Sequence, residues 1–206
     1  MRTVFFLLAC LAVVQPARAQ PNSAQLNPAQ AAEFVRKAGR DLAATVAGAT
    51  TPEERQKRLA PFVDRIVDVG SVAQFVLGRY WRAATEDQRR EYLKLFHTVL
   101  VNGVVGRLGD YQAGSTSVRI GKAEPKDDAV LVPTIVGRGS NKPVRVTWTI
   151  VNEGGSPRIA DVVAEGMSFR VTLRNDYTSF LSHHGNDMGT LLKGLQQQVA
   201  AAAEQR

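Results

Sequence analysis

The sequence predicts an α+β fold, in which a four-stranded curved antiparallel sheet is covered by N-terminal and C-terminal helices. Three observations predict this class. Helix-capping motifs and apolar residues at three- and four-residue spacing recur over residues 27–111 and predict helices there. The apolar period then changes to two over residues 118–163, with short connections that indicate an antiparallel sheet. Helical periodicity returns from Ser168, and runs of helices and strands in this order are typical of α+β proteins.

The N-terminal residues have the features of an export signal. Arg2 supplies a positive charge, residues 4–14 form an apolar run, and residues 17–19 read Ala-Arg-Ala, a small-x-small cleavage site. The run is about half as long as a membrane-spanning helix requires. We therefore expect residues 1–19 to be a signal peptide that is removed on export. An uncleaved anchor and lipoprotein processing at Cys10 are the alternatives.

The exported chain is expected to begin with a polar, flexible arm over residues 20–26, followed by a single α+β domain over residues 27–206. A chain of this length buries roughly 70% of its unfolded surface. Cys10, the one cysteine, lies in the signal, so the exported chain has no disulfide. The formal charge of +7 becomes +5 when two arginines leave with the signal. The basic residues are scattered without an aromatic stripe, which disfavours nucleic acid. They either solvate helix faces or dock on anionic headgroups or an acidic partner.

Three helix starts share one chemistry, in which an N-cap side chain precedes a partner three residues later. The three pairs are Asn27 with Gln30, Thr51 with Glu54, and Thr85 with Gln88. The helix after Thr85 is predicted to be about 25 residues long, because apolar residues recur at helical spacing as far as Tyr111. A shorter helix is predicted over residues 70–77, with Gly78 as its C-cap.

Four strands are predicted from alternation and turn signals. They begin with residues 118–120, continue with 129–136 and 144–150, and end with 159–163. A Glu-Gly-Gly-Ser turn at residues 153–156 joins the last two as a hairpin. Helices are then predicted over 168–181 and from Asp187 into the alanine-rich tail.

Residues with catalytic or metal-binding potential are few. His97, His183 and His184 lack the spacing of metal ligands. No nucleophile elbow or phosphate-cradling glycine loop is present in the sequence. Asp161 and Glu165 form an acidic pair for which an anchoring role at a turn or pocket mouth is expected. We therefore predict no catalytic residue, no metal and no cofactor, with a small-molecule enzyme using Asp161, Glu165 or His97 as an alternative.

Large apolar faces remain on the long helix, on one face of the sheet and on the C-terminal helices. Periodicity alone leaves two interpretations open, a filled core and a ligand cavity. The first corresponds to a scaffold or interaction protein without a ligand.

One ordered set of short segments resembles the MlaC family of periplasmic phospholipid-binding proteins, also known as toluene-tolerance auxiliary components. The segments are Phe75 to Thr85 (FVLGRYWRAAT) with Gln88 and Phe96, then Ile159 to Val162 (IADV), Glu165 to Ser168 (EGMS), Arg174 and Phe180. They extend over roughly residues 31–195. Many family members carry a tryptophan shortly before the position of Ile159, and this chain has Ser-Pro-Arg there. That departure leaves open a hopanoid-associated branch, with a different lipid.

The resemblance implies a non-enzymatic periplasmic carrier that shuttles phospholipid between an outer-membrane lipoprotein complex and an inner-membrane ABC transporter with an MCE-domain subunit. Such a carrier maintains outer-membrane lipid asymmetry, and we expect a monomer. The acyl tails would lie in an apolar pocket between the sheet and the helices.

The apolar faces then become candidate pocket walls. The helical wall would be Phe75, Phe96, Val99, Leu100 and Val104; the sheet wall Ile135, Val146, Trp148 and Ile150; and the closing residues Val163, Met167, Phe169 and Leu181. Arg79 and Arg174 are candidates for the headgroup at the pocket mouth.

Overall fold

The computed structural model describes residues 26–107, 116–139 and 142–204. Its elements are α1 (Pro28–Val46), α2 (Pro52–Ile66), α3 (Val69–Leu77), α4 (Arg79–Ala83), α5 (Glu86–Arg107), β1 (Thr116–Ile120), β2 (Glu124–Lys126), β3 (Ala129–Arg138), β4 (Val144–Glu153), β5 (Ser156–Ala164), β6 (Met167–Ser168), α6 (Phe169–His183) and α7 (Met188–Glu204). The predicted α+β class is confirmed. The expected signal peptide and residues 20–25 of the expected arm lie outside the described residues.

Within the described residues the sheet has six strands, where four were predicted. The strand order is β1-β3-β4-β5-β6, β2 also pairs with β3, and every pairing is antiparallel. The two additional strands, β2 and β6, have three and two residues, which is too short for alternation to show in a sequence. The pairing of β4 with β5 shifts between Thr149 and Ile150. Such a bulge bends a strand and supplies the predicted curvature.

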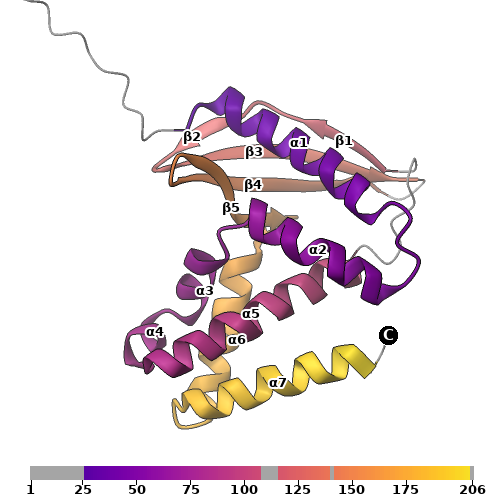
Figure 1. The fold of residues 1–206 in the computed structure, drawn as a ribbon. Helices are drawn as coiled ribbons and strands as arrows, with labels where there is room; N and C mark the ends of the chain where they lie inside the picture. Colours follow the sequence, from indigo (N-terminus) through magenta and orange to yellow (C-terminus); the bar gives the residue numbers. More distant parts are fainter. Residues whose placement is uncertain (1–25, 108–115, 140–141, 205–206) are drawn as a thin grey trace, which may run out of the picture.

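Helix α1 covers one face of the sheet (Figure 1). Val132 lies opposite Trp148, and Val130 lies opposite Ile150, so these apolar side chains share the face that α1 covers. The indole N–H of Trp148 donates to the Thr134 hydroxyl over 3.0 Å, which satisfies both polar groups on this face. The predicted alternation of β4 is therefore confirmed. Leu26, the last residue of the expected arm, is buried against the same face.

The predicted helix starts are confirmed by their caps. The side chains of Asn27 and Thr51 accept backbone N–H bonds at the starts of α1 and α2. Thr85 and Gln88 form the reciprocal capping box at distances of 3.0 and 3.2 Å. The described part of helix α5 has 22 residues and reaches Arg107, and the last part of its predicted length lies outside the described residues.

Gly78 ends α3 as predicted, with φ +56° and ψ −123°, and the chain then forms the unpredicted short helix α4. A residue with a Cβ rarely adopts such a conformation. The corner directs α4 away from the axis of α3 and places the start of α5 beside both helices.

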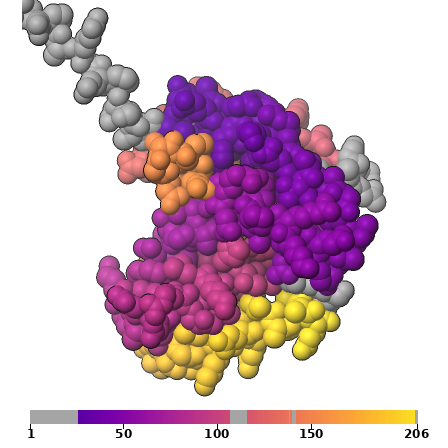
Figure 2. All heavy atoms as spheres, in the orientation of Figure 1, coloured from indigo at the N-terminus to yellow at the C-terminus, as the bar shows by residue number. Residues whose placement is uncertain are grey.

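The C-terminal helices begin within a residue of the predicted positions, and the side chains of Ser168 and Asp187 cap α6 and α7. Helix α6 contacts β5, whereas α7 lies along α5. Figure 1 shows the sheet and α1 at one end of the molecule, helices α3 to α7 at the other, and α2 between them. The space-filling view in Figure 2 shows α5 between the surfaces of α2 and α7. Within the described ranges, no helix combines the length and apolarity needed to cross a membrane.

Candidate functional site

The apolar interior is divided into three clusters of buried side chains. The helical cluster comes from α3 to α7 and includes Val72, Val76, Leu77, Tyr80, Tyr92, Leu95, Phe96, Leu100, Tyr177, Leu181, Met188, Leu191 and Leu195. The sheet cluster joins α1 to the sheet and consists of Leu26, Ala31, Val35, Val130, Val132, Ile150 and Ile159. The α2 cluster joins α2 to the second half of α5 and consists of Leu59, Phe62, Val63, Val101 and Val105.

The segment that links α2 to α3 connects the three clusters. Ile66 and Val67 pack against both the sheet cluster and the α2 cluster. Val69 packs against both the α2 cluster and the helical cluster. The apolar interior is therefore continuous from the sheet to the helices, although its buried residues fall into separate groups.

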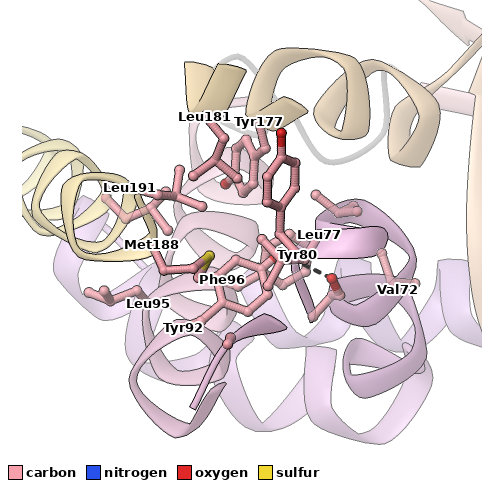
Figure 3. Close-up of a cluster of buried hydrophobic side chains, with 14 of the residues drawn as sticks. Val72, Leu77, Tyr80, Tyr92, Leu95, Phe96, Tyr177, Leu181, Met188 and Leu191 are labelled. Atoms are coloured by element: carbon pink, nitrogen blue, oxygen red, sulfur yellow. Dashed lines mark hydrogen bonds between the residues drawn. The ribbon is translucent and has the colours of Figure 1, made fainter. Parts of the chain in front are cut away.

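Aromatic rings hold the middle of the helical cluster together (Figure 3). The ring of Tyr177 on α6 meets Tyr92 and Phe96 on α5 edge-on, with centroid distances of 6.4 and 6.5 Å. Edge-to-face pairs at such distances are attractive beyond the area that they bury. Figure 3 also shows Leu181 from α6 and Met188 and Leu191 from α7 in the same cluster.

Two of the three tyrosine hydroxyls in this cluster, those of Tyr92 and Tyr177, differ in their hydrogen bonding. The Tyr92 hydroxyl donates to the Ala73 carbonyl over 3.1 Å, whereas the buried Tyr177 hydroxyl has no hydrogen-bond partner among the described residues. Burial raises the pKa of Tyr177 to about 12, and it also raises the pKa of Tyr92 far above the ordinary range. Both phenols are therefore neutral at physiological pH.

The structure brings six of the predicted pocket residues together in or against the helical cluster. They are Phe75, Phe96, Val99, Leu100, Phe169 and Leu181. Phe96 and Leu181 are fully buried, while Phe75, Val99 and Phe169 are partly exposed at its margin.

The other predicted pocket residues are distributed elsewhere. Trp148 and Ile150 belong to the sheet cluster, and Val104 packs against the α2 cluster. Val146 is buried on the face of the sheet that α1 covers. The predicted walls on β4 and α5 therefore belong to different clusters, which Ile66, Val67 and Val69 connect.

Three predicted pocket residues lie away from these clusters. Ile135 and Val163 are on the sheet face opposite to the one that α1 covers, opposite Arg145 and Thr147. Met167 projects from β6 and is 71% exposed. In the described ranges, none of the three is among the side chains that pack against the helical cluster. A lipid contact for any of the named residues stays a prediction.

The two predicted headgroup arginines lie against aromatic rings. The Arg79 guanidinium carbon is 4.9 Å from the centre of the Tyr80 ring, and Arg79 donates to the Tyr80 hydroxyl over 2.8 Å. The guanidinium carbon of Arg174 lies 4.9 Å from the Phe75 ring. A second arginine, Arg170, lies on Phe75 at 4.4 Å, and the sequence reasoning missed it. Arg170 and Arg174 are four residues apart and therefore lie on one face of the helix, and this spacing could have identified Arg170 from the sequence.

Asp161 is the anchor that the sequence predicted. Its side chain is buried, accepts the Ser168 hydroxyl over 2.6 Å, and accepts the backbone N–H groups of Val162 and Arg170 over 2.8 and 3.1 Å. The Arg170 guanidinium lies 3.6 Å away. This carboxylate therefore fixes the start of α6 to β5.

The remaining titratable candidates also have structural contacts. Glu165 accepts the backbone N–H of Arg145 over 2.7 Å, and His97 lies 2.8 Å from Asp64 of α2. Among residues 26–107, 116–139 and 142–204, no group of three or more His, Cys, Asp or Glu side chains is placed to hold a metal ion.

Known proteins have sequences and folds similar to those of this chain. The toluene tolerance protein ttg2D of Pseudomonas putida is 23% identical over 141 residues, which cover 68% of this chain and 65% of that protein. This chain thus spans slightly less than two thirds of that relative. A phospholipid-binding protein from Ralstonia solanacearum, solved in complex with a phospholipid, has the same fold with a TM-score of 0.75. The match has 20% sequence identity and covers 84% of this chain and 98% of that one.

The model of the MlaC protein family matches residues 34–197, which include α2 to α6, the whole sheet and most of α1 and α7. The segments that carried the resemblance in the sequence fall within this range. The chain belongs to the MlaC protein family.

Proposed function

We propose that this protein is a periplasmic carrier that binds phospholipid with its acyl tails in the apolar interior between the sheet and α5, and moves it between membrane complexes without chemical change. The observation that carries the proposal is the division of the interior into three clusters that meet at Ile66, Val67 and Val69. Compact domains usually have one contiguous core with smaller satellite clusters. We propose that acyl chains enter along the lines where these clusters meet, which would leave each cluster packed.

The chemistry of the ligand explains why a carrier is required. A two-chain phospholipid has about 30 methylenes, and their exposure to water costs about 0.8 kcal/mol each, or on the order of 25 kcal/mol in total. Free diffusion between membranes is therefore negligible. A carrier must offer an apolar volume of roughly 1,000 Å³, near the upper end of small-molecule pockets. Its net preference over the bilayer must be small, because it has to load and unload.

The comparisons support phospholipid as the ligand class. The Ralstonia solanacearum protein with this fold was solved with a phospholipid, and the Pseudomonas putida relative is a toluene tolerance protein. Toluene dissolves in membranes, so a tolerance function is consistent with lipid transport and the maintenance of outer-membrane lipid asymmetry. We propose an outer-membrane lipoprotein complex and an inner-membrane ABC transporter with an MCE-domain subunit as the partners. The export signal predicted over residues 1–19 supports a periplasmic location.

A hopanoid-associated lipid is the second candidate ligand. It is favoured by the Ser-Pro-Arg segment at residues 156–158, where many family members have a tryptophan. Both lipids require the same apolar interior, so the choice between them changes the cargo and not the carrier function.

A vesicle assay tests the proposal. Protein stripped of lipid is mixed with donor vesicles that contain a fluorescent phospholipid and with unlabelled acceptor vesicles. We expect transfer at a rate proportional to protein concentration, with the phospholipid recovered chemically unchanged. Lack of transfer would argue against a carrier, and recovery of a hydrolysed or otherwise altered lipid would indicate an enzyme.

A further inference from the structure

Two apolar side chains project from the junction of β6 with α6. Met167 is 71% exposed and Val171 is 43% exposed, and they are two of the five large apolar side chains that are exposed in the described ranges. Val171 lies in the first turn of α6, and Arg174 follows it at the i,i+3 spacing that places two side chains side by side on a helix. We refer to Met167, Val171 and Arg174 as the corner patch.

The backbone before Met167 is held firmly. Glu165 and Gly166 form the preceding turn with φ values of +49° and +84°. Positive φ is unfavourable for Glu165 and persists only where other contacts hold it. Its backbone N–H donates to the Arg145 carbonyl over 3.0 Å, and its carboxylate accepts the Arg145 N–H over 2.7 Å. The exposure of Met167 is therefore a property of a fixed turn.

The chain after Met167 is held as well. Ser168 donates to the buried Asp161 carboxylate over 2.6 Å and caps α6 by accepting the Val171 N–H over 3.2 Å. Both sides of the exposed methionine are thus bonded to the sheet. A surface that is already rigid loses little conformational entropy when a partner covers it.

Arg174 supplies a fixed positive charge at the edge of the patch. Its guanidinium lies on Phe75 and also packs against Gly78, where an added Cβ would be 3.3 Å from Nη2. Arg170 faces Asp161, whereas Arg174 forms no ion pair with a side chain in the described ranges. A flat guanidinium in a set orientation is suited to a carboxylate, because both groups are planar and can form two parallel bonds.

We propose that the corner patch is a docking site for a partner protein whose contact surface is apolar at its centre and acidic at its rim. This inference rests on the proposed function, in which the carrier must meet membrane complexes to load and unload. A protein partner is favoured over a lipid surface because the apolar part is small, the turn is rigid and the arginine has a set direction. A fluid bilayer would need none of these features.

The test measures binding of the lipid-loaded full chain to the purified soluble part of the MCE-domain subunit from the same organism. Met167→Glu and Val171→Glu place a negative charge at the centre of the patch and should each weaken binding by about tenfold or more, as at interface hot spots. Arg174→Glu should weaken binding and reduce its dependence on salt. Val118→Glu is the matched control, because Val118 is 53% exposed on β1, at the opposite edge of the sheet, and should bind as the wild type does.

The same proteins are tested on vesicles that contain phosphatidylglycerol, and the phospholipid content of each is measured after extraction. The proposal is overturned if the wild type does not bind the subunit, if the patch variants bind it as tightly as the control does, or if they lose only vesicle binding. If the wild-type protein contains no lipid, the proposed carrier function is contradicted. The docking proposal is judged separately, because it depends only on how tightly the variants and the control bind the subunit.

Discussion

The sheet cluster and the helical cluster are both apolar, but their side chains are held in different ways. In the sheet cluster, Val130 faces Ile150 across β3 and β4, and Ile150 faces Ile159 across β4 and β5. These β-branched residues have few rotamers, and the backbone ladder fixes their partners. The helical cluster is built from five helices and includes Met188 and several leucines and aromatic residues.

This difference indicates which side of the interior can adapt to a ligand. Packed helices slide past one another by small shear movements, and methionine fills irregular spaces. A hydrogen-bonded sheet cannot move in that way without a change of register. We infer that the sheet is the fixed wall of the lipid site, while the helical cluster adjusts to the acyl chains.

The largest expected effect is at Asp161, which connects the two regions. Asp161→Ala removes the acceptor for Ser168, Val162 and Arg170 and leaves their donors without a partner near the sheet. We expect a loss of about 3–4 kcal/mol in the free energy of unfolding, measured with urea. Asp176→Ala, an exposed position on α6, is the control and should change stability by less than about 0.5 kcal/mol. Equal effects in both variants would show that Asp161 does not anchor α6.

A second prediction concerns the Gly78 corner of the helical region. Gly78→Ala forces a Cβ into a conformation with positive φ and against Arg174, and should cost about 2 kcal/mol. Gly39→Ala is the matched control, since Gly39 lies in the middle of α1 with no atom near the added Cβ. Gly39→Ala should stabilise the protein by about 0.5–1 kcal/mol. Thermal unfolding should therefore show a lower melting temperature for Gly78→Ala and a higher one for Gly39→Ala. Melting-temperature shifts of the same sign in both variants would contradict the conclusion that the corner requires glycine at residue 78.

A third prediction tests the fixed sheet wall. Val146→Trp enlarges a buried side chain on this wall. The added indole would fill space that the acyl chains need, so lipid binding should weaken by about tenfold or more. Overpacking should lower the free energy of unfolding by about 1–3 kcal/mol, while circular dichroism shows a retained fold. Val118→Trp, on the same face of the sheet but exposed, is the control. Unchanged lipid content in Val146→Trp protein would place the ligand away from this wall.

The smallest effect separates Tyr92 from Tyr177, two of the three tyrosines of the helical cluster. Tyr92→Phe removes a hydrogen bond to Ala73 and should cost about 1 kcal/mol. Tyr177→Phe removes a buried hydroxyl that has no partner among the described residues, and should be neutral or slightly stabilising. Urea titrations would measure the free energy of unfolding of both variants. A clear loss of stability in Tyr177→Phe would reveal a partner for its hydroxyl.

The same tyrosines make stability depend on alkaline pH. The pKa of Tyr177 is raised to about 12 in the folded protein by burial, while an unfolded tyrosine titrates near pH 10. The unfolded state therefore releases its proton first, and stability should be fully present below about pH 10 and fall as the pH rises towards 12. Tyr177→Phe should flatten this fall, and an unaltered profile would mean that other groups cause it.

Local chemistry made much of the fold predictable from the sequence. The caps at Thr51, Thr85 and Ser168 depend on residues within four positions, and the hairpin at residues 153–156 depends on its two glycines. Strands of two or three residues carry too little alternation, which explains the omission of β2 and β6.

The site was less predictable, because periodicity shows that a face is apolar but not which face it meets. Phe96 and Val104 share the apolar faces of α5, yet Phe96 packs with α6 while Val104 packs against α2. Arg170 was missed for a similar reason, since its contact with Phe75 joins two helices that are distant in the sequence.

Organic extraction of the folded protein purified from bacteria, followed by mass spectrometry, tests whether the apolar interior carries phospholipid. We predict near-stoichiometric phospholipid in the extract. An extract without phospholipid or any other lipid, from protein shown to be folded, would contradict this prediction.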